Sequence, residues 1–393
     1  MQRNKVNFFS GMGMVEDKDK IWFASREING LFQIDVKEEK LIYLGDFPEE
    51  EGDSKDLYGK CIIVNKKIYF APYNANHIAI YDITRKNFSK ILIRKRGRGF
   101  LPIIFFKENI ILLPSSKLNN IIKFSINTNR IEYIENWKNA LDIDELNGMV
   151  FWDYCIKDNI IYAPIISSRG KILKYEIENN NITYIDTNVK QNFKCICCNE
   201  DFFFLTNDVG NILTILDKDC RMIDRIIIAE YSDIKIGNLV YKNGYIFLFT
   251  NNLFESEVPD MIIVFDPISQ ISKIIKLIFA QDTRNNIAHM RRLFMVSEQD
   301  DFINAFNGGN GIMYRVDSSD LSINEKQISI DGIEEIYREK GLKANSNIQF
   351  LEKNLESKHL ELFIDMVENS DLSKNKISNC GKEIWENNIK YYN

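Results

Sequence analysis

The feature that most constrains the fold is a short unit that recurs along the chain, in which a polar turn leads directly into a run of apolar residues. An apolar stretch also precedes each turn, so each unit predicts two antiparallel strands joined by a tight turn. The second runs begin 42 to 57 residues apart, at Ile21 (IWFAS), Ile68 (IYFAP), Ile110 (IILLP), Ile160 (IIYAP), Phe202 (FFFLT), Tyr245 (YIFLF) and Phe302 (FINAF).

The stretch from Lys60 to Ile93 shows the complete repeat. It predicts four short strands, at residues 61–64, 68–71, 78–83 and 88–93, with a turn at Asn65-Lys66-Lys67 and a polar loop from Tyr73 to His77. An acidic or amide residue closes the third strand of each unit, where such a side chain can hydrogen-bond its own backbone in a turn. These residues are Asp35, Asp82, Asn127, Glu178, Asp217, Asp266 and Asp317.

Four-stranded units that recur every forty to fifty residues are typical of β-propeller blades. We therefore predict an all-β fold, a seven-bladed β-propeller of four-stranded antiparallel blades within residues 1–330, with the repeats covering about residues 8 to 330. A six-bladed ring with one degenerate blade outside it is the alternative. In a closed ring only short strand edges remain exposed.

At this point the sequence resembles the large bacterial group of Kelch-like and WD40-like propellers, and the resemblance is one of architecture. The double glycine expected in the second strand of a Kelch blade occurs once, at Gly308-Gly309. The Trp-Asp dipeptide occurs only as Trp152-Asp153, in the wrong strand for a WD40 blade. The resemblance therefore implies no subfamily.

After residue 330 the strand pattern ends. Residues 333–340, 359–369 and 384–391 are expected to be helical, and Leu360, Phe363, Ile364 and Val367 lie on one face of the second of these helices. We expect residues 331–393 to form a C-terminal helical extension packed on the propeller. The alternative is a helix that binds a partner.

Composition excludes several classes of function. The chain has 393 residues with a net charge of −6, and therefore lacks the basic excess that nucleic-acid binding requires. No apolar run has the length of a membrane span, and the N-terminal residues do not resemble a signal peptide. Its 7 cysteines, an odd number, do not suggest a disulfide framework, so we expect a cytoplasmic protein.

No motif in the sequence identifies a reaction, a bound metal or a cofactor. We expect neither a metal nor a cofactor. Cys195, Cys197 and Cys198 cluster on a predicted inner strand without a second Cys/His pair at ligand spacing, so core packing is favoured. His77, His289 and His359 are scattered and belong to no metal-binding motif. The sequence contains no phosphate-binding loop and no nucleophile elbow.

Loops carry function on rigid scaffolds. The resemblance to propellers implies that the loops between second and third strands and those between blades share one rim. There, clustered arginines would favour a carboxylate or phosphate group. Residues 137–146 could form a short helix over the channel mouth. The candidate ligand-binding residues are Arg26, Tyr73, Asn76, His77, Arg96, Arg98, Trp152, Asp153, Arg169, Asp208, His289 and Arg291.

Two classes of function remain. The first is a non-catalytic recognition or scaffold propeller whose rim binds a protein, peptide or glycan that presents negative charge. The second is an enzyme that uses carboxylate, histidine and arginine residues around the central channel on an anionic or sugar substrate. The first class is favoured because the sequence shows no recognisable set of catalytic residues. The fold itself is compatible with both classes. A carboxylate within hydrogen-bond reach of His77 or His289 at the axis would favour the enzyme.

Overall fold

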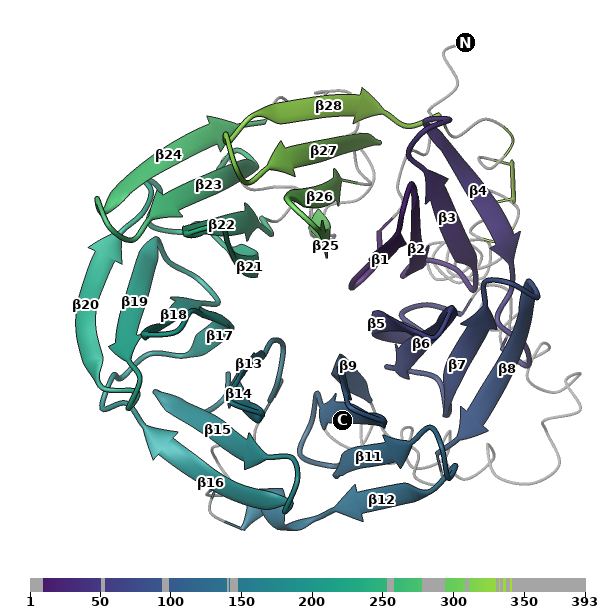
Figure 1. Cartoon of the computed structure of the whole chain (residues 1–393), viewed down its shortest axis with the longest axis horizontal. Helices are drawn as coiled ribbons and strands as arrows, with labels where there is room; N and C mark the ends of the chain where they lie inside the picture. The colour runs from purple at the N-terminus through teal and green to yellow at the C-terminus, as the bar shows by residue number, and fades with distance from the viewer. Residues whose placement is uncertain are drawn as a thin grey trace, which may run out of the picture. The chain divides into compact units, whose positions relative to one another are not determined.

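The computed structural model describes residues 10–50, 54–93, 99–139, 141, 148–252, 258–277, 294–307 and 311–329, with isolated residues at 332, 335, 336 and 340. The chain divides into two compact units, Met1–Arg338 and Glu339–Asn393. In the first unit, seven four-stranded antiparallel sheets surround a common axis (Figure 1). The prediction of seven blades is confirmed, and the six-bladed alternative is wrong.

The strands of each sheet follow one another in chain order, from the axis outward. Blade 1 contains β1 (Val15–Asp17), β2 (Lys20–Ala24), β3 (Leu31–Asp35) and β4 (Lys40–Gly45). Blade 2 contains β5 (Tyr58–Val64), β6 (Lys67–Pro72), β7 (His77–Asp82) and β8 (Asn87–Leu92). Blade 3 contains β9 (Phe100–Phe106), β10 (Asn109–Pro114), β11 (Ile121–Ser125) and β12 (Ile131–Ile134). Blade 4 contains β13 (Cys155–Lys157), β14 (Ile160–Pro164), β15 (Lys171–Glu176) and β16 (Asn181–Asp186).

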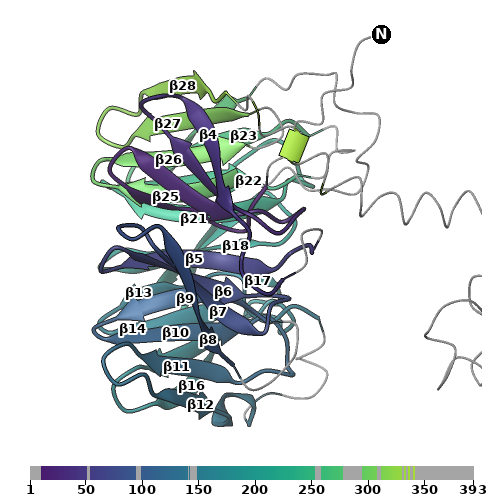
Figure 2. The ribbon, with the colours of Figure 1, turned by 90° about the vertical axis from the view of Figure 1, so that its right-hand side faces the viewer.

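The remaining three blades repeat this order, and Figure 2 shows the blades from the side of the ring. Blade 5 contains β17 (Phe193–Cys198), β18 (Phe202–Asn207), β19 (Ile212–Asp217) and β20 (Met222–Ile227). Blade 6 contains β21 (Ile236–Lys242), β22 (Tyr245–Thr250), β23 (Met261–Asp266) and β24 (Ile271–Lys276). Blade 7 contains β25 (Phe294–Gln299), β26 (Phe302–Asn307), β27 (Ile312–Asp317) and β28 (Ile323–Gln327).

Hairpin turns form the lower rim, which we define as the end of the ring that carries the turns between first and second strands and between third and fourth strands. Asn65 and Lys66 both have positive φ, 51° and 60°, as a two-residue hairpin turn requires. At the other kind of turn, Asp82 Oδ1 accepts hydrogen bonds from the backbone N–H groups of Thr84 and Arg85 at 3.0 and 2.9 Å. Asp35, Asp217, Asp266 and Asp317 accept hydrogen bonds in the same way, as predicted. Asn127 and Glu178 do not end third strands, since β11 ends at Ser125 and β15 at Glu176.

The core lies between adjacent blades, because both faces of each sheet are covered by its neighbours. Ile110, Ile111, Leu112 and Leu113 of β10 all have 0% exposed surface, although their side chains alternate between the two faces of the sheet. The near-continuous apolar runs of the second strands follow from this double burial.

Blades 1 and 7 close the ring without sharing a strand. A parallel bridge joins Lys40 of β4 to Ser329, and Leu41 N donates to Ser329 O at 2.8 Å. Lys326 of β28 forms an ion pair with Glu39 at 3.0 Å. An apolar cluster that includes Phe23 of blade 1 and Phe306 of blade 7 fills the interface. The closing interface therefore combines backbone, charged and apolar contacts.

Between blades 3 and 4 the chain forms a single 3-10 turn, η1 (Asn136–Lys138). Trp137 is completely buried there, packs on Phe151 with ring centroids 5.6 Å apart, and donates to Asn119 O at 3.2 Å. Trp137 begins the segment expected to form a short helix over the channel mouth, and its indole fills the apolar interface between two blades. Residue 140 and residues 142–147 lie outside the described part.

The expected C-terminal helices fall, apart from isolated residues, outside the described part of the chain, so their packing on the propeller stays a prediction. Within the described part, no helix combines the length and the apolar character needed to cross a membrane.

Candidate functional site

A cavity of about 520 Å³ lies on the propeller axis. Apolar side chains such as Val15, Ile62 and Val296 form much of its wall. The polar side chains that line it are Glu16, Lys60, Asp153, Asn238, Ser297 and Glu298, which come from five different blades. A concave, mostly preformed space with a few converging polar groups is the usual form of a ligand site.

Four inner strands contain an extra residue near their upper ends, toward the rim that carries the loops between second and third strands and between blades. We call this end the upper rim. The pairing of first and second strands shifts by one residue between Tyr58 and Cys61, between Phe100 and Ile103, between Phe193 and Cys195, and between Ile236 and Asn238. Such bulges re-aim side chains and backbone groups. They contain Lys60, Leu101, Lys194 and Gly237.

These bulges build a plug across the upper end of the axis. Met12, Leu101 and Trp152 are buried in one apolar cluster with Ile236. Blade 1 neighbours none of the blades that supply the other three residues, so Met12 meets this cluster across the axis. Trp152 Nε1 donates to the bulge carbonyl of Gly237 at 2.8 Å, which connects blades 4 and 6. These contacts join residues of blades 1, 3, 4 and 6 near the upper ends of the inner strands.

Two lysines from the bulges hold the plug together by charge. Lys60 Nζ lies 2.8 Å from Asp153 Oδ1, and these side chains are only 19% and 12% exposed. Lys194, which is 1% exposed, pairs with Asp208 at 2.8 Å, and its Nζ lies 4.7 Å from the centroid of the Trp152 ring. Because a charged group is costly to bury alone, each lysine requires its carboxylate in place.

The lower part of the cavity is acidic. Glu16 accepts hydrogen bonds from Ser297 Oγ at 3.1 Å and from Asn304 Nδ2 at 2.5 Å, both in blade 7. Burial raises the pKa of Glu16 despite these hydrogen bonds. Desolvation inside the cavity also raises the pKa of Glu298, although this residue is exposed, while the charge of Lys242 lowers it and that of Asp153 raises it. Two carboxyl groups that resist ionisation therefore face one cavity.

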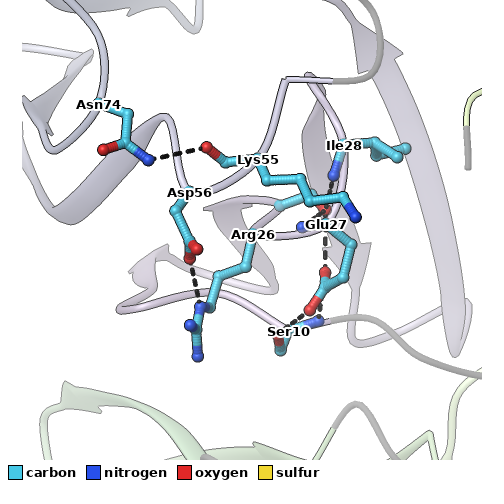
Figure 3. A network of polar contacts seen from close by, with 8 residues as sticks. Ser10, Arg26, Glu27, Ile28, Lys55, Asp56 and Asn74 are labelled. Atoms are coloured by element: carbon cyan, nitrogen blue, oxygen red, sulfur yellow. Dashed lines mark hydrogen bonds and ion pairs between the residues drawn. The ribbon is translucent and has the colours of Figure 1, made fainter. Parts of the chain in front are cut away.

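A second polar network lies on the upper rim between blades 1 and 2 (Figure 3). Arg26 Nε pairs with Asp56 Oδ1 at 2.7 Å. Next to it, the buried carboxylate of Glu27 accepts hydrogen bonds from Ser10 and from Ser25 Oγ. In Figure 3 the terminal nitrogens of Arg26 extend past the ion pair, away from Asp56. The network fixes the direction in which this guanidinium points.

The structure brings some of the predicted site residues together and separates others. Trp152 and Asp153 lie at the plug, Asp208 is joined to it through Lys194, and Tyr73 packs against the same apolar cluster. Asn76 and Arg169 are exposed. Arg96, Arg98, His289 and Arg291 lie outside the described residues.

His77 is buried on β7 and is not among the residues that line the axial cavity. Its Nε2 lies 2.8 Å from Tyr58 OH, while its Nδ1 is 3.7 Å from Glu50 Oε1, beyond hydrogen-bond reach. Burial lowers the pKa of His77, and the charge of Lys90 lowers it further. Tyr58 is 0% exposed, so this arrangement is a neutral contact inside the blade.

Sequence reasoning missed Glu16, Lys60, Lys194, Asn238 and Glu298. Each is a polar residue within, or directly beside, an apolar first-strand segment. In a propeller, a polar side chain in an innermost strand can face the central axis. Polar residues within apolar first-strand segments could therefore have been used to predict the residues of this cavity. The bulges were not predictable, because one extra residue does not alter blade spacing visibly.

Among the described residues, no group of three or more His, Cys, Asp or Glu side chains is arranged to hold a metal ion. Six described cysteines are free thiols: Cys61, Cys155, Cys195, Cys197, Cys198 and Cys220. Cys195, Cys197 and Cys198 lie on the inner strand β17, where the sequence placed them.

No protein-family model matches the sequence, and no curated protein matches it. Among solved structures, a streptogramin B lyase aligns with 83% of this chain and 96% of its own, at 12% identity and a TM-score of 0.60. Hsv2 from Kluyveromyces lactis aligns with 82% of this chain and 100% of its own, at 9% identity and a TM-score of 0.51.

The extracellular domain of the hybrid two-component system BT4673 from B. thetaiotaomicron aligns with 82% of this chain and 38% of that chain, at 12% identity and a TM-score of 0.55. Identities this low show the fold alone, since one fold hosts many functions. The chain is a seven-bladed β-propeller.

Proposed function

We propose that this protein is a non-catalytic recognition propeller whose upper rim binds a protein, peptide or glycan through a negatively charged group. The observation that carries the proposal is the orientation of Arg26. Its Nε is occupied by Asp56, and its terminal nitrogens extend beyond that pair. A guanidinium group held in this way is oriented to bind a carboxylate, sulfate or phosphate group by donating two parallel hydrogen bonds.

The surroundings of Arg26 support this role. Its side chain is 28% exposed, so it is reachable yet restrained by contacts with the rest of the rim. The buried Glu27 and Ser10 brace the adjoining backbone, and Arg26 N donates to Ser10 O at 2.9 Å. A restrained side chain loses less conformational freedom on binding, which favours affinity.

Further arginines are proposed to contribute to the same surface. Arg169 is exposed in the loop after β14. Arg96, Arg98 and Arg291 are assigned to the rim by the sequence argument alone.

The test is binding to an array of sulfated, phosphorylated and carboxylated glycans and acidic peptides. We expect Arg26→Ala to weaken binding to the best probe at least tenfold, because a charge-assisted hydrogen bond contributes about 1.5 to 3 kcal/mol. Arg26→Lys should restore little, since lysine lacks the fork. Arg85→Ala, in a lower-rim turn, is the matched control and should leave binding unchanged. Unchanged binding in Arg26→Ala would refute the assigned site.

The double variant Arg98→Ala, Arg291→Ala tests the sequence-assigned part of the surface. Lost binding with an unchanged melting temperature would include both loops in the site. Retained binding would restrict the site to the blade 1 and blade 2 side of the rim. Melting temperature is needed because arginines paired with rim carboxylates could act on stability instead, though exposed pairs contribute little.

The second candidate is an enzyme acting on an anionic or sugar substrate in the axial cavity. It is favoured by Glu16 and Glu298, whose raised pKa values suit a general acid. Glu298→Gln would then abolish turnover of a cavity-bound substrate while leaving rim binding intact. The recognition function predicts instead that Arg26→Ala weakens ligand binding and that Glu298→Gln leaves ligand binding unchanged.

A further inference from the structure

A second cavity, of about 660 Å³, opens on the lower rim, far along the inner strands from the plug. It lies where the turn after β13 meets the turn after β17, and Tyr241 of blade 6 completes it. Its lining includes Lys157, Asp158, Cys198, Glu200 and Asp201. None of these residues takes part in the rim or axial sites.

Two thiols meet beside this cavity. Cys198, at the end of β17, is half-buried, and its Sγ lies 3.6 Å from Ile156 O of β13. Cys155, on the neighbouring inner strand β13, is buried in the apolar cluster against which Cys198 packs. Cys197, the preceding residue, is only 7% exposed. Cys198 is therefore the thiol of this group that reaches the cavity, and Cys155 supports it from within the protein.

An ammonium group stands near the pair without a hydrogen-bond acceptor of its own. Lys157 Nζ is buried without a hydrogen-bond partner and lies 5.0 Å from the centroid of the Phe203 ring. The ring offers it only a cation–π contact. A negative charge formed on Cys198 would thus supply an electrostatic partner that the resting protein does not provide.

The charged groups around Cys198 act together on its ionisation. Cys155 lowers the pKa of the Cys198 thiol, burial raises it, the Lys157 charge lowers it and Asp158 raises it, with a net lowering. Cys197 lies next to it on the same strand, and Glu200 and Asp201 lie on the following turn. Burial raises the pKa values of Cys61, Cys155, Cys195 and Cys197 instead.

We propose that Cys198 is a covalent modification site for small soft electrophiles, hydroperoxides in particular. The site consists of an accessible sulfur in a cavity, a second thiol in the apolar cluster beside it and a buried ammonium group without a hydrogen-bond partner in the same cavity lining. Thiolate formation, rather than exposure alone, determines cysteine reactivity. Cys155 and Lys157 serve as positioning residues that stabilise the thiolate.

With a hydroperoxide the reaction is a two-electron oxidation of the sulfur. The Cys198 thiolate attacks the terminal peroxide oxygen, an S–O bond forms and the O–O bond breaks. The sulfur becomes a sulfenic acid, while the other oxygen leaves as an alcohol or, from hydrogen peroxide, as water after taking a proton. The hydroperoxide is the oxidant, so no further co-reactant is needed.

The experiment uses the reduced full-length chain in its native state. Limiting iodoacetamide, or hydrogen peroxide followed by the sulfenic-acid trap dimedone, is added, and peptide mass spectrometry locates the label. We expect Cys198 to react at least tenfold faster than Cys61, Cys155, Cys195, Cys197 or Cys220. A rate at Cys198 equal to those of the buried thiols would overturn the proposal.

Variants separate activation from exposure. Lys157→Gln and Cys155→Ala should each slow alkylation of Cys198 at pH 7 and move its pH–rate profile to higher pH. Cys220→Ala, elsewhere in the same apolar cluster, is the matched control and should change neither. Melting curves confirm that each variant is folded. If both variants are folded and keep the wild-type pH–rate profile, the positioning roles are refuted.

Discussion

The two ends of the propeller are built on different principles. On the lower rim each hairpin turn is local, and its conformation depends on two or three neighbouring residues. On the upper side, Lys60, Leu101, Lys194 and Gly237 leave the regular pairing of four separate blades and meet partners from other blades. The turns at the lower end are shaped within single blades, although polar contacts such as Lys66–Asp17 also join neighbouring blades there. At the upper end, the bulges connect blades that are not neighbours.

This difference indicates which end of the propeller can carry specificity for a ligand. Bulges cost regular pairing, yet they recur in blades 2, 3, 5 and 6 at corresponding positions. They place Lys60 beside Asp153 in the axial cavity, and they bring Lys194 to Asp208 and the Gly237 carbonyl to Trp152. We infer that the plug gives the upper rim a rigid base, and that rim loops are displayed on this base.

The largest expected effect comes from removing the centre of the plug. Trp152→Ala should lower the free energy of unfolding by about 3 to 5 kcal/mol, because it leaves a cavity among four blades and an unpaired carbonyl at Gly237. Phe105, an aromatic residue that is 39% exposed, is the matched control. Phe105→Ala should cost far less in chemical denaturation. Equal losses of unfolding free energy would show that Trp152 in the plug stabilises the protein no more than an exposed aromatic residue does.

The next effect concerns the charged pair in the plug. Lys60→Met should cost roughly 3 kcal/mol, because it leaves the carboxylate of Asp153 buried without its cation. The double variant Lys60→Met, Asp153→Asn should recover most of this loss, since no isolated charge remains. Denaturant midpoints of the three proteins measure the coupling. Additive losses would contradict a direct interaction.

The sequence predicted the lower end well because its signals are local. Asn65-Lys66, with a polar turn between two apolar runs, determines a hairpin without help from other blades. Asp82 and its counterparts likewise fix the turns into the outer strands. Repetition of these local signals at blade-sized intervals was enough to give the number of blades.

The axial site could not be predicted in the same way. Lys60 and Asp153 are 93 residues apart, and their contact depends on ring closure and on a bulge of one residue. His77, a histidine at a loop boundary, suggested a ligand contact, and its part in binding stays a prediction. The structure pairs it with Tyr58 inside blade 2. Only the fold decides which way such a side chain faces.

A lower-rim turn offers a smaller effect of opposite sign. Lys66 adopts φ of 60°, a conformation that glycine adopts without steric cost, and blade 6 has glycine at the corresponding turn, Gly244. Lys66→Gly should therefore stabilise the protein by about 0.5 to 1 kcal/mol, in line with the Asn-Gly preference of such turns. Its exposed ion pair with Asp17 is expected to subtract little. Thermal melting measures the change, and a clear loss of stability would show that this turn is not local.

The smallest effect is a pH dependence that originates below the plug. Desolvation raises the pKa of the half-buried Glu16, and that of the more exposed Glu298 in the same cavity, from an ordinary value of 4.5. The folded protein therefore binds more protons than the unfolded chain in the window just above that value. Stability contributed by these groups must therefore fall as the pH rises through this window, and the loss is complete above the folded pKa.

Glu16→Gln and Glu298→Gln remove the titration while keeping a side chain of similar shape. Many exposed carboxylates, such as Asp266 and Asp317, have lowered pKa values and produce the opposite slope. The informative quantity is therefore the difference in unfolding free energy between each variant and the wild type, followed by urea denaturation from pH 4 to 8. That difference should shift in favour of the variant as the pH rises. A pH-independent difference would mean that the two carboxyl groups ionise in the folded protein as they do in the unfolded chain, and that the cavity beneath the plug is as well solvated as the lower rim.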